Sequence, residues 1–136
     1  MADTLPEAAL QETFAACRYH HTLRMRLELV EPGRVRVHQA WGEDLDQAMG
    51  RVHGGVYAAL LDAASFYAAW SACPAGEDLP LTQEYKINLL ASARRQDLVA
   101  ESRVIKLGRR VAVVETTIAT ADGVAIAIGL TSLVRG

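Results

Sequence analysis

The sequence predicts an α+β fold, with one long helix packed against an antiparallel sheet of about six strands. Several segments alternate apolar and polar residues, which is the pattern of half-buried strands. One stretch, Gly54 to Ala72, is apolar and rich in alanine over a length that suits a helix and exceeds an ordinary strand. The dipeptide Asp122-Gly123, typical of tight hairpins, separates two strand-like segments. The 136 residues fit one domain, residues 1–136, without a linker or a repeat.

The N-terminal part is expected to form a short helix and then a hairpin. Glu7 to Cys17 has apolar residues at helical spacing and acidic residues early, as in a short amphipathic helix. From Leu23 to Leu29, apolar residues alternate with charged ones, which indicates a strand. Glu31-Pro32-Gly33 then supplies a turn into a second strand, in which Val35 and Val37 face one way.

A loop without periodicity, Trp41 to Val52, leads into the long helix. Seven alanines lie between Ala58 and Ala72, and Pro74 and Gly76 stop the helix. A helix that is apolar nearly all round must be buried on most sides. The stretch Val56 to Ala75 is also about as long as a membrane span, but its central carboxylate would cost about 2.5–3.5 kcal/mol to insert. We therefore expect a buried helix and no membrane.

Four strand-like segments follow the helix and complete the sheet. They are rich in β-branched residues, and glycine-containing turns, at Gly108 and at Asp122-Gly123, separate the last three of them. Their expected bounds are Leu81–Leu90, Asp97–Leu107, Arg109–Ala121 and Val124–Val134. In the last segment, the larger apolar side chains are expected to share one face of the strand: Val124, Ile126, Ile128 and Leu130.

Composition excludes several classes of function. Fourteen Lys and Arg against sixteen Asp and Glu give a formal net charge of -2, unlike a nucleic-acid-binding protein. The two cysteines, Cys17 and Cys73, form no disulfide framework and lack metal-ligand spacing, so no metal is expected. The first sixteen residues contain no basic side chain, which argues against a targeting signal and favours a cytoplasmic protein. His20, His21 and His38 are interpreted as surface or loop histidines.

The helix start, His53-Gly54-Gly55, is the first candidate for chemistry. Glycine costs about 0.5–1 kcal/mol relative to alanine inside an element. One reason for two glycines here is a sharp turn of the chain. The other is that a helix N-terminus offers unpaired N–H groups and a partial charge of about +0.5. Because Gly54 has no side chain, a substrate carbonyl could approach these groups closely. On this second interpretation the helix start is an oxyanion hole.

Asp62 is the second candidate, because it is the one carboxylate in an otherwise apolar helix. As a structural residue it is a partly exposed acid or a hydrogen-bonded buried one. As a functional residue it is a poorly solvated nucleophile or general base. Gly54 and Asp62 are eight residues apart, which is about 12 Å on one helix. Since one carbonyl cannot contact both, their joint action requires two antiparallel copies of the helix, and hence a homodimer.

These residues resemble those of a known family. The pattern Gly50-x-x-His53-Gly54-Gly55, followed by Asp62 in a long helix, is similar to the core motif of the hotdog-fold acyl-CoA thioesterases. Within them it most resembles the phenylacetate-degradation and 4-hydroxybenzoyl-CoA thioesterase branch. The resemblance extends from Leu23 to Leu133. It implies a sheet curved around the central helix, homodimers that often pair into homotetramers, and thioester hydrolysis at the dimer interface. Coenzyme A is part of the substrate, and no other cofactor is implied.

The resemblance also implies roles for the residues at the helix start. The Gly54 N–H would polarise the thioester carbonyl, with Gly55 also contacting the substrate. Asp62 of the facing subunit would attack the carbonyl or activate water. His53 would orient the loop and the start of the helix.

The resemblance also implies roles for Gln47 and Thr82. Gln47 sits where the family usually places Asn or Gln, whose side-chain amide binds the carbonyl or the lytic water. Thr82 falls where many members have a Ser or Thr hydroxyl near the nucleophile.

The sequence also departs from the phenylacetate branch. It has Gln47-Ala48 where many members show Asn-Pro, and Leu89-Leu90-Ala91-Ser92 where many show Tyr-Leu-Arg-Pro. These departures leave the core motif intact and concern the substrate.

Two pairs of arginines lie near the ends of predicted strands, Arg94 with Arg95 and Arg109 with Arg110. They are interpreted either as solvated charges or, as the resemblance implies, as ligands for the phosphates of coenzyme A.

Together these features predict a cytoplasmic acyl-CoA thioesterase that releases a small aryl or short-to-medium acyl group as the free acid. Two alternatives stay open. A hotdog-fold hydratase or dehydratase would act on β-hydroxyacyl thioesters, but such enzymes pair a His with an acid in a different pattern. A non-catalytic acyl-CoA-binding domain would keep the fold without needing Asp62.

Overall fold

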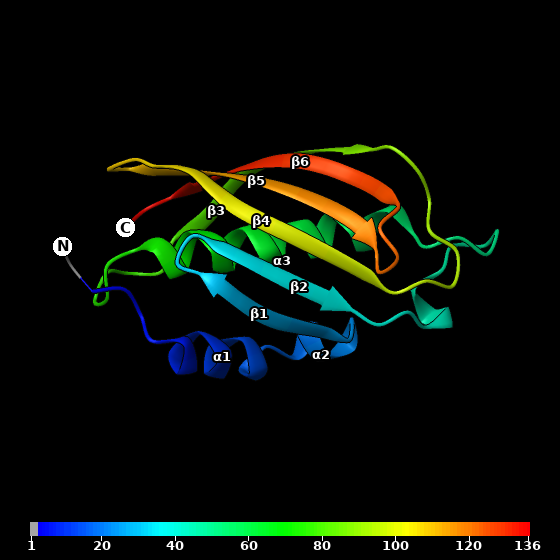
Figure 1. Cartoon of the computed structure of the whole chain (residues 1–136), viewed down its shortest axis with the longest axis horizontal. Coiled ribbons are helices and arrows are strands. Elements are labelled where there is room, and N and C mark those ends of the chain that lie inside the picture. Colours follow the sequence, from blue (N-terminus) through cyan, green and yellow to red (C-terminus); the bar gives the residue numbers. More distant parts are fainter. Residues whose placement is uncertain (1–2) are drawn as a thin grey trace.

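Six antiparallel strands form one sheet in the order β1-β2-β4-β5-β6-β3 (Figure 1). The computed structural model describes residues 3–136. The strands are β1 (Met25–Glu31), β2 (Arg34–Gln39), β3 (Leu81–Leu89), β4 (Leu98–Leu107), β5 (Val111–Thr120) and β6 (Ala125–Val134). Strands β1 and β3 are the two edges of the sheet.

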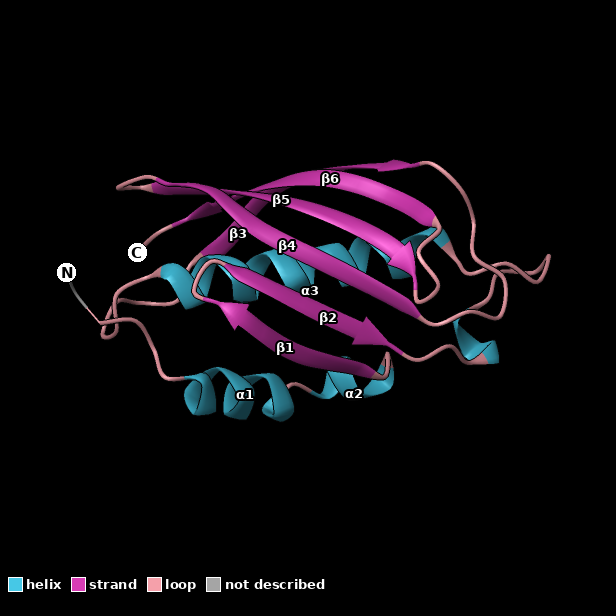
Figure 2. Ribbon diagram, in the orientation of Figure 1, coloured by secondary structure: helices cyan, strands magenta, loops and turns pink. Residues whose placement is uncertain are grey.

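The long helix α3 (Gly54–Ala72) lies across one face of this sheet (Figure 2). Two short helices, α1 (Glu7–Ala16) and α2 (Arg18–Thr22), lie beside β1, and a 3-10 turn, η1 (Glu43–Leu45), stands in the loop before α3. The expected α+β fold is therefore confirmed, with a helix whose bounds agree with those expected from the sequence.

The segment before β1 differs from the sequence-based expectation, because a second helix, α2, precedes the strand. The N–H of Leu23 donates to the carbonyl of Tyr19 at 3.1 Å, which makes Leu23 part of the helix end. Arg24 then adopts a left-handed conformation with φ of 54°. The chain can extend only after this reversal, so the strand begins at Met25 and not at Leu23.

Helix α3 is held at both ends and buried along one side. The Nδ1 atom of His53 caps its first turn, and Pro74 follows the C-cap residue. Leu60, Leu61 and Ala64 are fully buried against the sheet, which confirms the expected buried helix. No helix within residues 3–136 has both the length and the apolar character needed to cross a membrane.

One side of α3 is not covered by the sheet, and we call it the free face. Its residues are partly or fully exposed and recur at helical spacing: Gly55, Ala58, Ala59, Asp62, Ala63 and Phe66. All except Asp62 and Phe66 are small, so another helix could approach closely. The free face is the part of α3 that positions the candidate site.

The side chains of β6 do not share one face as expected. Residues Ile118 and Ala119 of β5 pair with Ala127 and Ala125, so Ile126 is an extra residue in β6. This bulge turns Ile126 into the core, whereas Ile128 and Leu130 point outward with 47% and 51% of their surface exposed. The expectation of a single apolar face was wrong because alternation cannot reveal a bulge.

Candidate active site

The start of α3 presents one unused backbone donor. The N–H of Gly55 donates to Nδ1 of His53 at 2.8 Å, and the N–H of Val56 donates to the His53 carbonyl at 2.9 Å. For the N–H of Gly54, no acceptor is present among residues 3–136. Because Nδ1 of His53 accepts a hydrogen bond, the neutral ring carries its proton on Nε2. His53 thus orients the helix start and leaves the Gly54 N–H available to a ligand.

The side chain of Gln47 is a second polar group at the cavity that Gly54 lines. Its Oε1 atom accepts from the N–H groups of Met49 at 2.5 Å and Arg51 at 3.3 Å. Since both of these groups are donors, they must face the amide oxygen, and the NH₂ group of Gln47 points away from the loop. Gln47 and Gly54 line the same cavity, of about 390 Å³. We call the pair, with His53, the oxyanion half-site.

Arg51 also belongs to this region, although the sequence interpretation did not single it out. Its guanidinium lines the cavity of the oxyanion half-site and donates to Oγ of Ser92 at 2.7 Å. This contact ties the loop before α3 to the segment after β3. The signal available in the sequence was a cation two residues before His53, in a motif otherwise free of charge.

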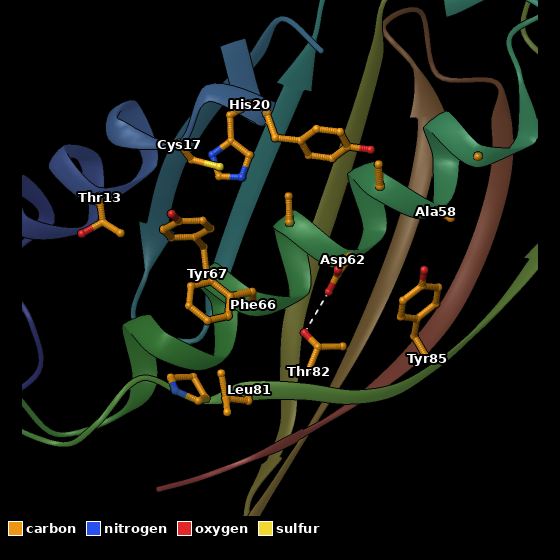
Figure 3. A pocket seen from close by; sticks show the side chains of 15 residues that line it. Thr13, Cys17, His20, Ala58, Asp62, Phe66, Tyr67, Leu81, Thr82 and Tyr85 are labelled. Carbon is orange, nitrogen blue, oxygen red and sulfur yellow. Dashed lines mark hydrogen bonds between the residues drawn. The ribbon is translucent and has the colours of Figure 1, made fainter. Parts of the chain in front are cut away.

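Asp62 lies half-buried in the middle of the free face, next to β3. Its Oδ1 atom accepts a hydrogen bond from Oγ1 of Thr82 at 2.8 Å (Figure 3). Ser65 is not part of this arrangement, because its hydroxyl donates to the backbone carbonyl of Asp62. Asp62 and Thr82 line a cavity of about 710 Å³ that also includes Gly55. We call Asp62 with Thr82 the acid half-site.

The structure therefore brings the predicted site residues together in two groups and not in one. Gly54 and Asp62 belong to the same continuous helix, eight residues or about 12 Å apart, and they line different cavities. A carbonyl bound at the Gly54 N–H of one chain is out of reach of Asp62 in that same chain. A single subunit thus holds the predicted site residues as two separate groups.

The two arginine pairs lie at opposite ends of β4. Arg94 and Arg95 are exposed in the loop before this strand, and Arg109 and Arg110 are exposed in the turn after it. The ten residues of β4 span about 33 Å, so one ligand cannot reach both pairs on one chain. The first pair is closer to the oxyanion half-site, because the N–H of the adjacent Ala93 donates to Oη of Tyr57.

His20, expected at the surface, is buried with only 8% of its area exposed. Its ring stacks on Phe14 at 4.1 Å between centroids, and its Nδ1 atom lies 3.1 Å from the carbonyl oxygen of Phe14. The expectation was wrong because α2, which places His20 against α3, was not anticipated. Burial lowers the pKa of His20, and the neighbouring His21 acts in the same direction, against the bond to Phe14.

Burial of His20 predicts a pH-dependent stability. Its pKa in the folded protein is below that in the unfolded chain, so the unfolded state binds more protons as the pH falls below about 6.5. The stability conferred by neutral His20 is present above that pH and is lost below it. We expect the melting temperature to fall more steeply from about pH 7.5 to about pH 5.5 in the wild type than in His20→Gln. Parallel curves in calorimetry would contradict this expectation.

Comparison with known proteins connects this geometry to a family. The family model of the thioesterase superfamily matches residues 49–127, which include the helix start, Asp62 and Thr82. A protein of Saccharolobus solfataricus named "Putative esterase SSO2140" is 31% identical over 119 residues, covering 87% of this chain and 84% of that protein.

Two solved structures extend the comparison. The crystal structure of a thioesterase family protein from Silicibacter pomeroyi is 31% identical and covers 95% of this chain and 96% of that one, with a TM-score of 0.88. A hypothetical thioesterase protein from Streptococcus pneumoniae, solved with coenzyme A, is 21% identical with a TM-score of 0.75, covering 82% of this chain and 85% of that one. At this lower identity the likeness shows the hotdog fold alone.

These matches confirm the resemblance to the hotdog-fold thioesterases, and with it the expected enzyme class, a thioester hydrolase. The chain belongs to the thioesterase superfamily.

Proposed function

We propose that the protein hydrolyses the thioester of an acyl-CoA with a small aryl or short-to-medium acyl group, releasing the free acid and coenzyme A. The observation that supports the proposal most strongly is that α3 carries two kinds of polar group at two separate places. One end of α3 offers unused donors for an oxyanion, and its middle offers a carboxylate held by a hydroxyl. The coenzyme A in the related Streptococcus pneumoniae structure supports this carrier for the acyl group.

In the proposed reaction the Gly54 N–H and the Gln47 NH₂ group donate to the thioester carbonyl oxygen of the substrate. Asp62 of the facing subunit then acts in one of two ways. It attacks the carbonyl carbon, expels the coenzyme A thiolate and forms an anhydride that water hydrolyses, or it takes a proton from water as the water attacks. Thr82 holds the carboxylate in place by donating to Oδ1. Both routes end in the free acid and coenzyme A.

The edge strand β3 supports the pairing of subunits that this chemistry needs. No strand within residues 3–136 pairs with the outer side of β3, and its apolar side chains are exposed, with Leu81 68% and Leu89 52% accessible. Monomeric proteins avoid such an edge. We propose that β3 pairs with its copy in an antiparallel manner about a two-fold axis. This pairing sets two α3 helices antiparallel on the same face of a continuous sheet, so that each oxyanion half-site faces an acid half-site.

A homotetramer is proposed to form through the outer face of the sheet. Ile128 and Leu130 are exposed there, between Lys86 on β3 and Glu115 on β5. The second two-fold axis would run parallel to the strands above the seam between the two β3 strands, where it crosses the first axis, and would stack the exposed outer faces of the two dimers on each other. Light scattering on the wild type measures whether the particle has two or four chains.

The direct test of the proposed function is a panel of acyl-CoAs, aryl and aliphatic, assayed for release of free thiol. We expect the best member to reach a kcat/KM of about 10⁴ M⁻¹s⁻¹ or more. Absence of release from every member would overturn the proposal. Tight binding without release would instead favour an acyl-CoA-binding domain, and hydration of an enoyl-CoA would favour a hydratase.

Mixing two inactive variants tests the location of the site between subunits. Asp62→Asn keeps the oxyanion half-site, and Gly54→Pro keeps the acid half-site. After unfolding and refolding together in equal amounts, half of the dimers contain one chain of each kind, and each of these has one complete site. We expect about a quarter of the wild-type activity. If both halves acted within one chain, the mixture would stay as inactive as its components.

A further inference from the structure

Tyr57 of α3 is a buried polar side chain to which the proposed reaction assigns no role. It follows Gly54 by three residues, so both lie on the same side of the helix, and both line the cavity of the oxyanion half-site. Tyr57 is only 2% exposed, and its Oη atom accepts a hydrogen bond at 2.8 Å from the N–H of the buried Ala93. The beginning of α3 is therefore fastened to the segment that follows β3.

Ala93 also holds the chain that enters α3. Its carbonyl oxygen accepts from the N–H of Val52 at 3.0 Å, and Val52 is the residue before His53. The N–H of His53 in turn donates to the carbonyl oxygen of Leu45 at 2.9 Å. Two consecutive backbone N–H groups before the helix are thus fixed by other segments. The position of the backbone that leads to Gly54 therefore depends on where Ala93 lies.

These contacts close a ring around the start of the helix. From Gly54 the ring runs along α3 to Tyr57 and across the hydroxyl to Ala93. From the carbonyl of that residue it returns through Val52 and His53 to the helix start. Because an N–H lies in the plane of its peptide unit, the backbone of His53 sets the direction of the Gly54 N–H. Loss of one link in the ring would free that direction to vary.

We propose that Tyr57 is a positioning residue of the proposed reaction, which aims the Gly54 N–H at the thioester carbonyl oxygen. A donor that is already oriented stabilises an oxyanion best, since it needs no rearrangement as the charge develops. The role does not extend to the acid half-site, because Tyr57 does not line the cavity that contains Asp62. The inference rests on the proposed thioesterase function and adds a residue to it.

Tyr57→Phe tests the role directly, because it removes the hydroxyl and keeps the ring. We expect kcat and kcat/KM for the best acyl-CoA of the panel to fall together by about tenfold, with KM within about twofold of the wild type. The two constants fall together because the affected hydrogen bond strengthens in the transition state. Steady-state kinetics well below the melting temperature measure both. A rise in KM at unchanged kcat would show a role in substrate binding and would overturn the inference.

A double-mutant cycle with Gly54→Pro tests whether Tyr57 acts through this N–H. Proline removes the group that Tyr57 is proposed to aim. In the Gly54→Pro background, Tyr57→Phe should therefore change kcat by less than about twofold. If the two losses of kcat multiply instead, Tyr57 acts elsewhere and the inference is overturned.

Ser71→Ala is the matched control for the loss of a buried hydrogen bond. Near the other end of α3, Oγ of Ser71 accepts from the N–H of Gly33 at 2.9 Å, and both residues are buried. Like Tyr57→Phe, this variant leaves a buried backbone N–H without its partner, so both variants should have a lower melting temperature. We expect kcat of Ser71→Ala to stay within about twofold of the wild type. An equal loss of kcat in both variants would show only a loosening of α3 and would overturn the inference.

The outcomes separate the inference from the proposed function. If the wild type hydrolyses acyl-CoAs and Tyr57→Phe is equally active, the inference is overturned while the thioesterase function stands. If no member of the acyl-CoA panel releases thiol, the function and the inference fail together.

Discussion

Asp62→Asn is expected to lower kcat for acyl-CoA hydrolysis by about 10²–10⁴-fold, because the amide can neither attack a thioester nor take a proton from water. The variant keeps the shape of the side chain, and the amide oxygen can still accept from Oγ1 of Thr82, so the fold should not change. Steady-state kinetics with the best substrate of the panel measure the effect. A rate equal to that of the wild type would remove Asp62 from the mechanism.

Thr82→Val is expected to lower kcat less than Asp62→Asn does. It removes the hydrogen bond to Asp62 but leaves the carboxylate, so the expected loss of kcat is roughly tenfold.

A single turnover in ¹⁸O-labelled water separates the two routes for Asp62. Label incorporated into its carboxylate indicates a nucleophile, and label found only in the released acid indicates a general base.

Gly54→Pro is expected to lower kcat by about 10²–10³-fold, because proline removes the N–H proposed to bind the carbonyl oxygen. The position is suited to this change. Proline is favoured at the first position of a helix, and the extended conformation of His53, with φ of -62° and ψ of 138°, is the one that a following proline requires. No hydrogen bond within residues 3–136 is lost, so the melting temperature should stay the same or rise.

Gly54→Ala is the matched control, because alanine keeps the N–H. A Cβ atom at this position would lie 3.5 Å from Cδ1 of Leu89, which is an ordinary van der Waals contact. We expect kcat within a few-fold of the wild type. If the proline and alanine variants were equally impaired, the effect would arise from the added side chain, and the N–H would have no role.

Much of the fold could be predicted because its causes are local. The bounds of α3 follow from the alanine-rich run, the glycines at its start and the proline after its end, all visible as a sequence pattern. The spacing of Gly54 and Asp62 on one helix also follows from helix geometry alone. Those features needed no knowledge of the neighbouring elements.

Other features depend on contacts between distant segments. The bulge at Ile126 arises from the pairing of β6 with β5, and alternation within one strand does not contain that information. His20 is buried only because α2 packs it between Phe14 and Tyr67, which is 47 residues further along the chain. A histidine near the N-terminus has the same local sequence whether or not such a helix covers it.

The sequence by itself determined the long buried helix, its glycine start, the lone carboxylate and the strands that follow, because propensity, periodicity and spacing act over a few residues. Only the tertiary structure decided that Thr82 donates to Asp62, and that Gln47 accepts from the N–H of Met49 and lines the same cavity as Gly54. These outcomes depend on how separate elements are oriented when the core packs. The residues of the candidate site and its division into two halves could therefore be predicted from the sequence, whereas the contacts that hold each half in place could not.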